Sequence, residues 1–322
     1  MAVPLHKRAK RAIRSLLLRA SVRLLSFLPL MPALLLGRAV GYLAWFVSPQ
    51  NRRLMLQHLA MAFPERAEAE RRAIARASLV HLGELVAETI AMRGRVRPIE
   101  GYVSIAEGGE ETVRRAMERG RGLIYAAGHI GNWELLACRL ALLTRPAAVI
   151  AKRNSDDWLN RTIEQLRTRW GLKTLWREDA ATGREIVRLL RKGGGLGILI
   201  DQDTRVQGVF VPFFGSLAFT PRAVGDLALR FGATVVGVAS HRRGDRVGAG
   251  HELEIAELSY DPNPSDRERE VERLTAAAVA FQEAAIRRHP NEWVWMHRRW
   301  RTRPGMEQEA ARMPKSRELS SI

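Results

Sequence analysis

Cysteine is scarce in this sequence, with Cys138 as the single one among 322 residues. This scarcity excludes a disulfide framework and any zinc or iron–sulfur site built from cysteines. Lysine is also rare, since six of the 52 basic residues are lysine and the other 46 are arginine. With 34 acidic residues the net charge is +18, which predicts an anionic partner: a nucleic acid, an anionic membrane or an acidic protein.

Acidic residues are absent before Glu65, although ten basic residues precede it. The ten are Lys7, Arg8, Lys10, Arg11, Arg14, Arg19, Arg23, Arg38, Arg52 and Arg53. Among them lies an apolar run at 24–47, about long enough to cross a bilayer, which takes ~20 residues. Pro29 and Pro32 interrupt this run, so it can cross the membrane, re-enter it or lie in the interface against anionic headgroups.

We expect the run at 24–47 to associate with a membrane, because its apolar length coincides with a one-sided cluster of positive charge. The alternative is a buried helix of a soluble domain. A cleaved signal peptide is disfavoured, since the apolar part is long and shows no small-residue cleavage site. Basic residues flank both ends, so the charge pattern leaves the orientation open.

Several common catalytic and cofactor motifs are missing from the sequence. There is no glycine-rich phosphate loop, no GxSxG nucleophile elbow and no HExxH zinc motif. The glycines at 193–197 precede a predicted strand instead of opening a helix, which indicates a turn. We therefore expect neither a cofactor nor a metal site.

Predicted strands and helices alternate through most of the chain. Strands are expected at 122–127, 146–151, 172–176, 196–201 and 234–240, with 251–259 as an antiparallel partner. Helices are expected at 66–93, 109–119, 132–143, 156–170, 182–192, 220–232 and 265–288. This alternation predicts an α/β fold with a largely parallel central sheet flanked by helices.

The domain organisation follows from the changes in composition along the chain. Residues 1–48 are expected to form a basic and hydrophobic membrane anchor, with a membrane-associating helix. Residues 49–302 are expected to form the α/β domain. The polar stretch 303–322 contains two prolines and is expected to be a disordered tail.

The stretch GHIGNWE at 128–134 follows a predicted buried strand. Ligands of open α/β sheets bind beyond the carboxyl ends of strands, so His129 stands where chemistry is expected. On a continuous helix His129 and Glu134 would lie about 140° apart, so they meet only if Gly131 and Asn132 form a turn. Asn132 is also a good N-cap for the next helix.

A histidine held by a carboxylate is a good general base near neutral pH. The alternative interpretation of the same residues is a hydrogen-bonded core histidine and a glutamate that complements the helix dipole. Because the strand end, the glycine turn, the N-cap and the carboxylate fall within seven residues, we favour the catalytic interpretation.

The His-x4-Glu pattern within GHIGNWE resembles the first signature of the lysophospholipid acyltransferase superfamily. HxGNWE is most similar to the late (lauroyl/myristoyl) acyltransferases of bacterial lipid A. Three further stretches, at 152–167, 190–215 and 293–304, resemble later motifs of this family in the same order. The second contains DQDTRVQG, and the sequence lacks the Pro-Glu-Gly stretch of the phospholipid branch. Both features favour the glycolipid branch.

The resemblance implies transfer of a fatty acyl chain from an acyl carrier protein thioester to a hydroxyl of a lipid A precursor. His129 would take the hydroxyl proton and Glu134 would orient His129, without a covalent acyl-enzyme. The implied partners are acyl carrier protein, an anionic glycolipid and the bacterial inner membrane, with the catalytic domain on the cytoplasmic side. No nucleic acid is expected, and Cys138 is expected to be a core residue.

Further substrate contacts are also implied by the resemblance. Arg153, Arg167 and Arg177 match positions where the family tends to keep arginine, a planar and permanently charged donor that suits phosphosugars. Asp201, at the end of another predicted strand, is expected to position the acceptor or to support the arginines. Asn132 is grouped with these substrate-binding residues. Each arginine has a surface salt bridge as its alternative role.

Two aromatic groups leave alternatives open. Phe210, Phe213 and Phe214 can line an acyl groove or form plain core. The tryptophans of 293–304 can rest on lipid headgroups or pack on the core, and we expect structural support with some headgroup contact.

Three other functions remain open at this stage. The same chemistry can act on another glycolipid, such as a phosphatidylinositol mannoside. A basic nucleic-acid-binding protein is less consistent with the sequence, because no nucleic-acid motif is present and the apolar run would be unexplained. A degenerate scaffold protein is disfavoured by the intact His129 and Glu134.

Overall fold

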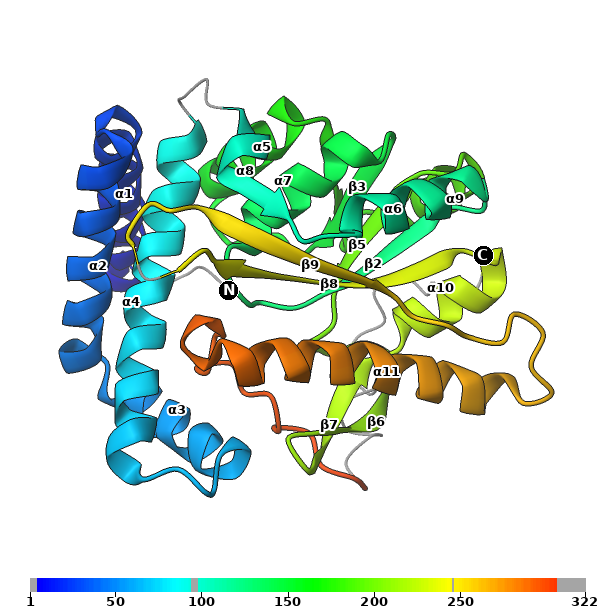
Figure 1. The fold of residues 1–322 in the computed structure, drawn as a ribbon. Coiled ribbons are helices and arrows are strands. Elements are labelled where there is room, and N and C mark those ends of the chain that lie inside the picture. The colour runs from blue at the N-terminus through cyan, green and yellow to red at the C-terminus, as the bar shows by residue number, and fades with distance from the viewer. Residues whose placement is uncertain (1–4, 94–97, 245, 306–322) are drawn as a thin grey trace.

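The computed structural model describes residues 5–93, 98–244 and 246–305 (Figure 1). A seven-stranded sheet forms its centre, in the order β1-β9-β8-β2-β5-β3-β4. Its strands are β1 (Val103–Ile105), β2 (Leu123–Ala127), β3 (Ala147–Ala151), β4 (Leu172–Trp176), β5 (Gly195–Leu199), β8 (Thr234–Arg242) and β9 (His251–Glu257). Neighbours pair in parallel except β8 with β9, which are antiparallel. The predicted α/β fold with a largely parallel sheet is confirmed.

Helices cover both faces of this sheet (Figure 1). They are α1 (Leu5–Phe27), α2 (Leu30–Val47), α3 (Pro49–Ala62), α4 (Glu68–Arg93), α5 (Ile99–Tyr102), α6 (Gly109–Glu118), α7 (Trp133–Leu143), α8 (Asp157–Arg169), α9 (Thr182–Arg191), α10 (Ala223–Phe231), α11 (Arg267–Arg288) and the 3₁₀ turn η1 (Pro290–Glu292). The expected tail at 303–322 lies outside the described residues from 306 onward.

The core consists of two apolar clusters, one on each face of the sheet. In β2, Ile124 and Ala126 belong to one cluster, and Leu123 and Tyr125 belong to the other. All five residues of β2 are buried, which explains the uninterrupted apolar run of this strand, since helices cover it on both sides.

A two-stranded hairpin outside the main sheet was not predicted. It pairs β6 (Gly208–Phe213) with β7 (Ser216–Pro221). The helix expected at 220–232 therefore starts only at Ala223, because the residues before it pair with β6. Phe214 and Gly215 form the tight turn between the strands with φ of 50° and 73°, as two-residue hairpin loops require.

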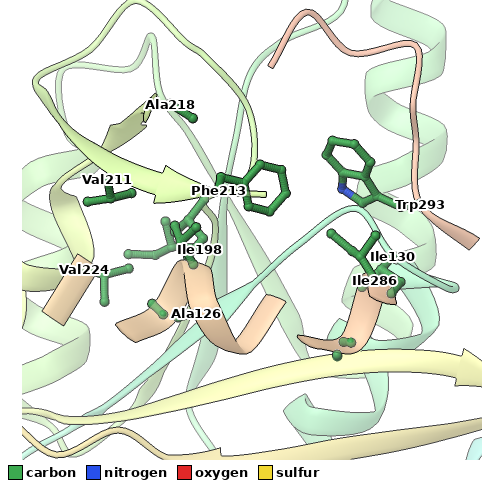
Figure 2. Packing of buried hydrophobic residues seen from close by; sticks show 14 of the residues in the cluster. Ala126, Ile130, Ile198, Val211, Phe213, Ala218, Val224, Ile286 and Trp293 are labelled. Atoms are coloured by element: carbon green, nitrogen blue, oxygen red, sulfur yellow. The ribbon is translucent and has the colours of Figure 1, made fainter. Parts of the chain in front are cut away.

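The hairpin joins the core beneath the C-terminal segment, where Figure 2 shows Phe213 beside Trp293. The centroids of these two rings are 5.6 Å apart. Phe213, Phe214, Trp293 and Trp295 are all buried. These aromatic side chains are therefore core, and the headgroup contact expected for the tryptophans does not apply to Trp293 or Trp295.

The N-terminal apolar run forms two helices instead of one. α1 ends at Phe27 and α2 begins at Leu30, with Pro29 as the N-cap. Proline lacks an N–H and disfavours a helical conformation of the residue before it, so a break at this point is expected.

α2 packs closely against α4, because glycines lie where the two helices cross. A Cβ atom on Gly37 would lie 2.4 Å from the Gly83 oxygen, and one on Gly41 would lie 2.3 Å from the Leu79 oxygen. Small residues at a helix crossing allow the backbones to approach. Arg38 of α2 also forms an ion pair with Glu84 of α4, with 2.5 Å between nitrogen and oxygen.

The opposite side of α2 is apolar and exposed. Its exposed side chains include Met31, Leu35, Leu36, Val40, Leu43, Phe46 and Val47. Among the described residues, α2 is the one helix long and apolar enough to cross a membrane.

Candidate active site

The register of the central sheet brings His129 and Asp201 together. β2 and β5 are parallel neighbours in which Ala127 pairs with Leu199. His129 and Asp201 each stand two residues beyond these paired strand ends, so both follow the same edge of the sheet. The Nδ1 atom of His129 lies 2.8 Å from Oδ1 of Asp201.

Both carboxylate oxygens of Asp201 accept hydrogen bonds. Oδ2 accepts the backbone N–H of His129 at 2.7 Å and the indole N–H of Trp293 at 2.7 Å. Burial raises the pKa of Asp201, but the nearby His129 and the Trp293 indole hold that pKa well below its usual range. Asp201 is therefore an ionised and buried partner of the histidine. Its predicted role in positioning the acceptor remains a prediction.

The contact with the ionised Asp201 favours a proton on Nδ1 of His129, because a carboxylate accepts and does not donate. If Nδ1 donates its proton to Asp201, Nε2 carries the lone pair and is the basic nitrogen. Nε2 accepts a hydrogen bond from the side-chain amide of Gln202 at 3.1 Å. The His129 side chain is 14% exposed, so it remains open on one side.

Two more side chains flank the imidazole of His129. The ring of His297 lies 4.9 Å from it and the ring of Trp133 lies 5.0 Å from it, measured between centroids. Burial and the proximity of His129 lower the pKa of His297 to about 4, so His297 is neutral near pH 7. The same Gln202 amide also contacts His297.

The turn predicted between His129 and α7 is present. Gly131 has a φ of 59°, and a Cβ atom there would lie 2.1 Å from the Ser240 oxygen. Only glycine fits this left-handed and crowded position. Asn132 caps α7 by accepting from the backbone N–H of Leu135 at 3.1 Å, as predicted.

Glu134 lies in the first turn of α7, but its carboxylate binds Arg167 instead of His129. Arg167 Nε and Nη2 donate to the two oxygens of Glu134 at 2.9 and 2.7 Å. The carboxylate hydrogen-bonded to the His129 ring belongs to Asp201. The role of Glu134 in orienting His129 therefore has no contact to support it and remains a prediction.

A narrow cavity of about 50 Å³ lies between α7 and the strands β2, β3 and β5. Its apolar lining includes Tyr125, Trp133, Leu136, Ala137, Leu140, Ala141, Val149, Gly197 and Leu199. Glu134 and Arg167 are the two charged residues of the lining. Because Trp133 contacts both this cavity and His129, the cavity adjoins the imidazole.

In the described part of the chain, Asn132, Arg153 and Arg177 form no hydrogen bond with His129. The Asn132 side chain is fully buried and contacts Glu88 and Leu135, so its predicted contact with the substrate remains a prediction. Arg153 binds Asp179 at 2.8 Å and stacks on Trp176. Arg177 follows β4 and donates its backbone N–H to Ala151.

A buried polar network behind the GHIGNWE turn was missed in the sequence. Its centre is Glu88 of α4, which binds His251 at 2.7 Å and Tyr102 at 2.5 Å. Glu88 also accepts from Asn132 at 2.8 Å and from Arg242 at 3.3 Å. The sequence does contain one signal for this network. Glu84 and Glu88 lie one helical turn apart on the otherwise apolar side of a predicted helix.

Comparison with known proteins agrees with this architecture. Residues 6–302 match the family described as bacterial lipid A biosynthesis acyltransferase. The chain is 28% identical to a lipid A biosynthesis lauroyltransferase of Escherichia coli K12 over 276 residues, which cover 84% of this chain and 85% of that protein. It is 25% identical, over the same lengths, to a lipid A biosynthesis palmitoleoyltransferase of that organism.

A further relative is a phosphatidylinositol mannoside acyltransferase of Mycolicibacterium smegmatis. It is 25% identical over 191 residues, which cover 58% of this chain and 59% of that protein. The fold, the site and these relatives together define an O-acyltransferase. The chain belongs to the bacterial lipid A biosynthesis acyltransferase family. This confirms the resemblance that its sequence motifs indicate.

Proposed function

We propose that this protein transfers a fatty acyl chain from an acyl carrier protein thioester to a hydroxyl group of a lipid A precursor. The observation that carries the proposal is the His129–Asp201 pair at the carboxyl end of the sheet, in which Asp201 holds Nδ1 of the imidazole. Nε2 contacts only the amide of Gln202 among the described residues, and the acceptor hydroxyl displaces this contact. The anionic acceptor and the acidic carrier both suit a chain with a net charge of +18.

His129 acts as the general base in this mechanism. Its Nε2 takes the proton of the acceptor hydroxyl, and the oxygen attacks the thioester carbonyl carbon to form the new ester C–O bond. The C–S bond then breaks, and the leaving thiolate takes the proton back from the imidazolium. No covalent acyl-enzyme is needed, and Cys138 is unsuited to forming one, because burial raises the pKa of its thiol.

Asp201 is the positioning residue in this account. Its ionised carboxylate fixes the tautomer of His129 and stabilises the imidazolium that forms during proton transfer. Glu134 has an indirect role, since its ion pair with Arg167 ties the start of α7 to α8 beside the base. Arg167 therefore supports the site mainly by binding Glu134, and contact with the substrate is secondary to this role.

We infer that part of the donor's acyl chain enters the apolar cavity beneath α7, since about 50 Å³ is too small for the whole chain. The cavity adjoins His129 through Trp133 and is lined by alkyl and aromatic side chains, which an acyl chain requires. The Glu134–Arg167 pair supplies a polar boundary at this cavity. In this view the free space along α7 sets the preferred chain length.

The exposed apolar side of α2 lies against the cytoplasmic leaflet of the bacterial inner membrane. Its large apolar side chains would be exposed to water if no membrane covered them. Its opposite side is fixed to α4 by the glycine crossing and the Arg38–Glu84 pair. A helix held along the domain in this way favours an interfacial position over a single crossing, and it keeps the site near a membrane-bound acceptor.

The test is mass spectrometry of lipids after incubating membranes that contain the protein with acyl carrier protein thioesters and a tetra-acylated lipid A precursor. Wild type is expected to yield a product heavier by one acyl chain, and His129→Ala is expected to yield none. Transfer by His129→Ala at the wild-type level would contradict the mechanism.

A second acceptor is favoured by one observation, the similarity to a phosphatidylinositol mannoside acyltransferase. The same experiment with phosphatidylinositol mannosides in place of the lipid A precursor separates the two. Product from the mannosides alone would assign the enzyme to that acceptor and keep the chemistry.

A further inference from the structure

An open groove of about 690 Å³ lies between α3 and the start of α4. Arginine is the commonest residue of its lining: Arg52 and Arg53 come from α3, and Arg71 and Arg72 come from α4. Glu68 is the one carboxylate among the described residues that line it. Four positive charges therefore stand against one negative charge, and the proposed acyl-transfer mechanism uses none of these residues.

Two of these arginines are held in place by backbone carbonyl groups. Nη1 of Arg52 donates to the Trp45 oxygen at 3.2 Å, and its guanidinium lies over the Trp45 ring, 5.4 Å from the centroid. Nη1 of Arg71 donates to the Arg66 oxygen at 2.7 Å and to the Phe63 oxygen at 3.3 Å. These carbonyl groups fix the two guanidinium groups without neutralising their charge.

The positive charge of the groove is largely uncompensated by the protein. Within residues 5–93, 98–244 and 246–305, Arg52, Arg53 and Arg71 form no ion pair. Arg72 pairs with Glu68 at 2.8 Å, but both side chains are more than half exposed, and such a pair is weak in water. A guanidinium has five N–H donors, so donors remain on Arg52 and Arg71 for a ligand.

The donors of this groove suit a phosphate group. Guanidinium groups form paired hydrogen bonds with phosphate oxygens, and several of them can share one phosphate. The volume of the groove lies within the range of ~300–1,000 Å³ that is typical of small-ligand sites. Leu56 and Pro49 add apolar surface to the lining, which suits the glycerol part of a lipid headgroup better than a bare ion.

The groove adjoins the end of α2, where large apolar side chains are exposed. Phe46 and Val47 are both exposed, and Pro49, two residues further on, already lines the groove. Figure 1 shows α3 beginning directly beyond this end of α2. A phospholipid carries its phosphate next to its acyl chains, so a lipid whose chains lie against Phe46 and Val47 has its phosphate at the groove. Arginine and tryptophan are both typical of the headgroup level of a membrane.

We propose that the groove between α3 and α4 binds the headgroup phosphate of an anionic membrane phospholipid, at a site separate from the acceptor site at His129. Arg52 and Arg71 bind the phosphate oxygens, and Arg53 strengthens the positive field at the opening. The lipid chains lie beside the end of α2. The bound lipid fixes how the domain is rotated on the membrane surface. This inference rests on the proposed contact of α2 with the membrane, and it does not depend on acyl transfer.

The test uses the full chain in a nonionic detergent, titrated with phosphatidylglycerol or with phosphatidylcholine of the same acyl chains. Native mass spectrometry counts the lipids bound per chain. We expect one phosphatidylglycerol to bind about 10-fold more tightly than phosphatidylcholine and to raise the Tm by about 2–4 °C at saturation. Inorganic phosphate at the same concentration is expected to leave the Tm unchanged. Equal affinity for the two phospholipids, or an equal rise in Tm with inorganic phosphate, would overturn the proposal.

Arg52→Gln and Arg71→Gln are each expected to weaken phosphatidylglycerol binding about 10-fold. Arg53→Glu is a third groove variant with the same expected effect. Its side chain is exposed and has no hydrogen-bond partner among the described residues, so the change removes no internal contact. The double variant Arg184→Gln/Arg188→Gln is the matched control, because it removes exposed charge from α9, outside the groove. Unchanged binding by all three groove variants, or equal weakening in the control, would overturn the proposal.

Acyl transfer to a detergent-dispersed precursor separates this inference from the proposed function. The groove variants are expected to keep the wild-type transfer rate, whereas His129→Ala is expected to lose transfer and to keep phosphatidylglycerol binding. Loss of lipid selectivity in a wild type that still transfers would overturn this inference alone. Weaker binding of acyl carrier protein by Arg53→Glu, with undiminished phosphatidylglycerol binding, would also overturn it and would assign the groove to the carrier protein.

Discussion

Two carboxylate–histidine pairs in this protein have almost the same geometry and different surroundings. Asp201 and His129 are 2.8 Å apart, and Glu88 and His251 are 2.7 Å apart. The His129 side chain is 14% exposed, whereas both members of the second pair are completely buried. The second nitrogen of His129 faces Gln202, while the second nitrogen of His251 is buried without a hydrogen bond.

This contrast shows that a short histidine–carboxylate contact does not by itself identify a catalytic base. Glu88 also binds Tyr102, Arg242 and Asn132, so its pair belongs to a closed network that joins α4, α5, β8 and β9. His129 stands instead beyond the carboxyl end of a parallel strand, and its side chain is partly exposed. Access and position distinguish the two pairs.

The largest change in acyl-transfer rate is expected from Asp201→Asn, which removes the carboxylate of the first pair. Loss of the anion and the correct tautomer is expected to lower the acyl-transfer rate by about 10²-fold or more. The measurement is the single-turnover rate with acyl carrier protein thioester, normalised to folded enzyme. Glu134→Gln is the comparison variant, with a smaller expected loss of rate, and a larger loss there than in Asp201→Asn would restore Glu134 as the orienting carboxylate.

The second prediction concerns the buried pair. His251→Ala removes one partner of Glu88 and leaves a buried charge less well compensated, which is expected to cost about 3–5 kcal/mol of unfolding free energy. Thermal unfolding in detergent measures this loss as a lower Tm. A Tm within a degree of wild type would show that the pair contributes little to stability.

Acid is expected to weaken the contribution of Glu88 to the stability of the fold. Burial raises the pKa of Glu88, but the neighbouring His251 and Arg242 bring it well below the ordinary value of 4.5. Glu88 therefore stabilises the fold above that ordinary value, and this contribution is lost as the pH falls toward the lowered pKa. The difference in unfolding free energy between wild type and Glu88→Gln is expected to shrink between about pH 6 and pH 3, and a difference that grows over this range would reverse the assignment.

The smallest predicted effect concerns chain length. Ala141→Leu adds bulk to the cavity beneath α7, where Ala141 is 1% exposed. We expect a shift of the product toward shorter acyl chains when the enzyme is offered a mixture of thioesters, read from lipid masses. Cys138→Val, on the same helix but outside the cavity lining, is the control, and an equal shift in both variants would place the acyl chain elsewhere.

Most of the fold follows from local patterns in the sequence. The buried strands and amphipathic helices from residue 109 onward lie within a few positions of their predicted bounds, because hydrophobic periodicity and capping residues act locally. The hairpin at 208–221 was missed, since its strands pair only with each other and its apolar side is covered by distant parts of the chain.

The candidate site was only partly predictable for a similar reason. His129 and the turn at Gly131 follow from local sequence, and Asp201 was found at the end of a second strand. That Asp201 faces His129 depends on β2 and β5 being neighbours in register, which the spacing along the chain does not specify. Glu134 is close to His129 in sequence, but Arg167 from α8 binds its carboxylate.

We expect His129 to act on the substrate and His251 to act on stability alone. The most direct test measures the single-turnover acyl-transfer rate and the Tm of His129→Ala and His251→Ala side by side. We expect His129→Ala to keep a Tm near wild type and to lose about 10²- to 10⁴-fold in rate. His251→Ala is expected to lower the Tm and to keep its rate per folded molecule. Full transfer by folded His129→Ala would show that His129 is not the general base.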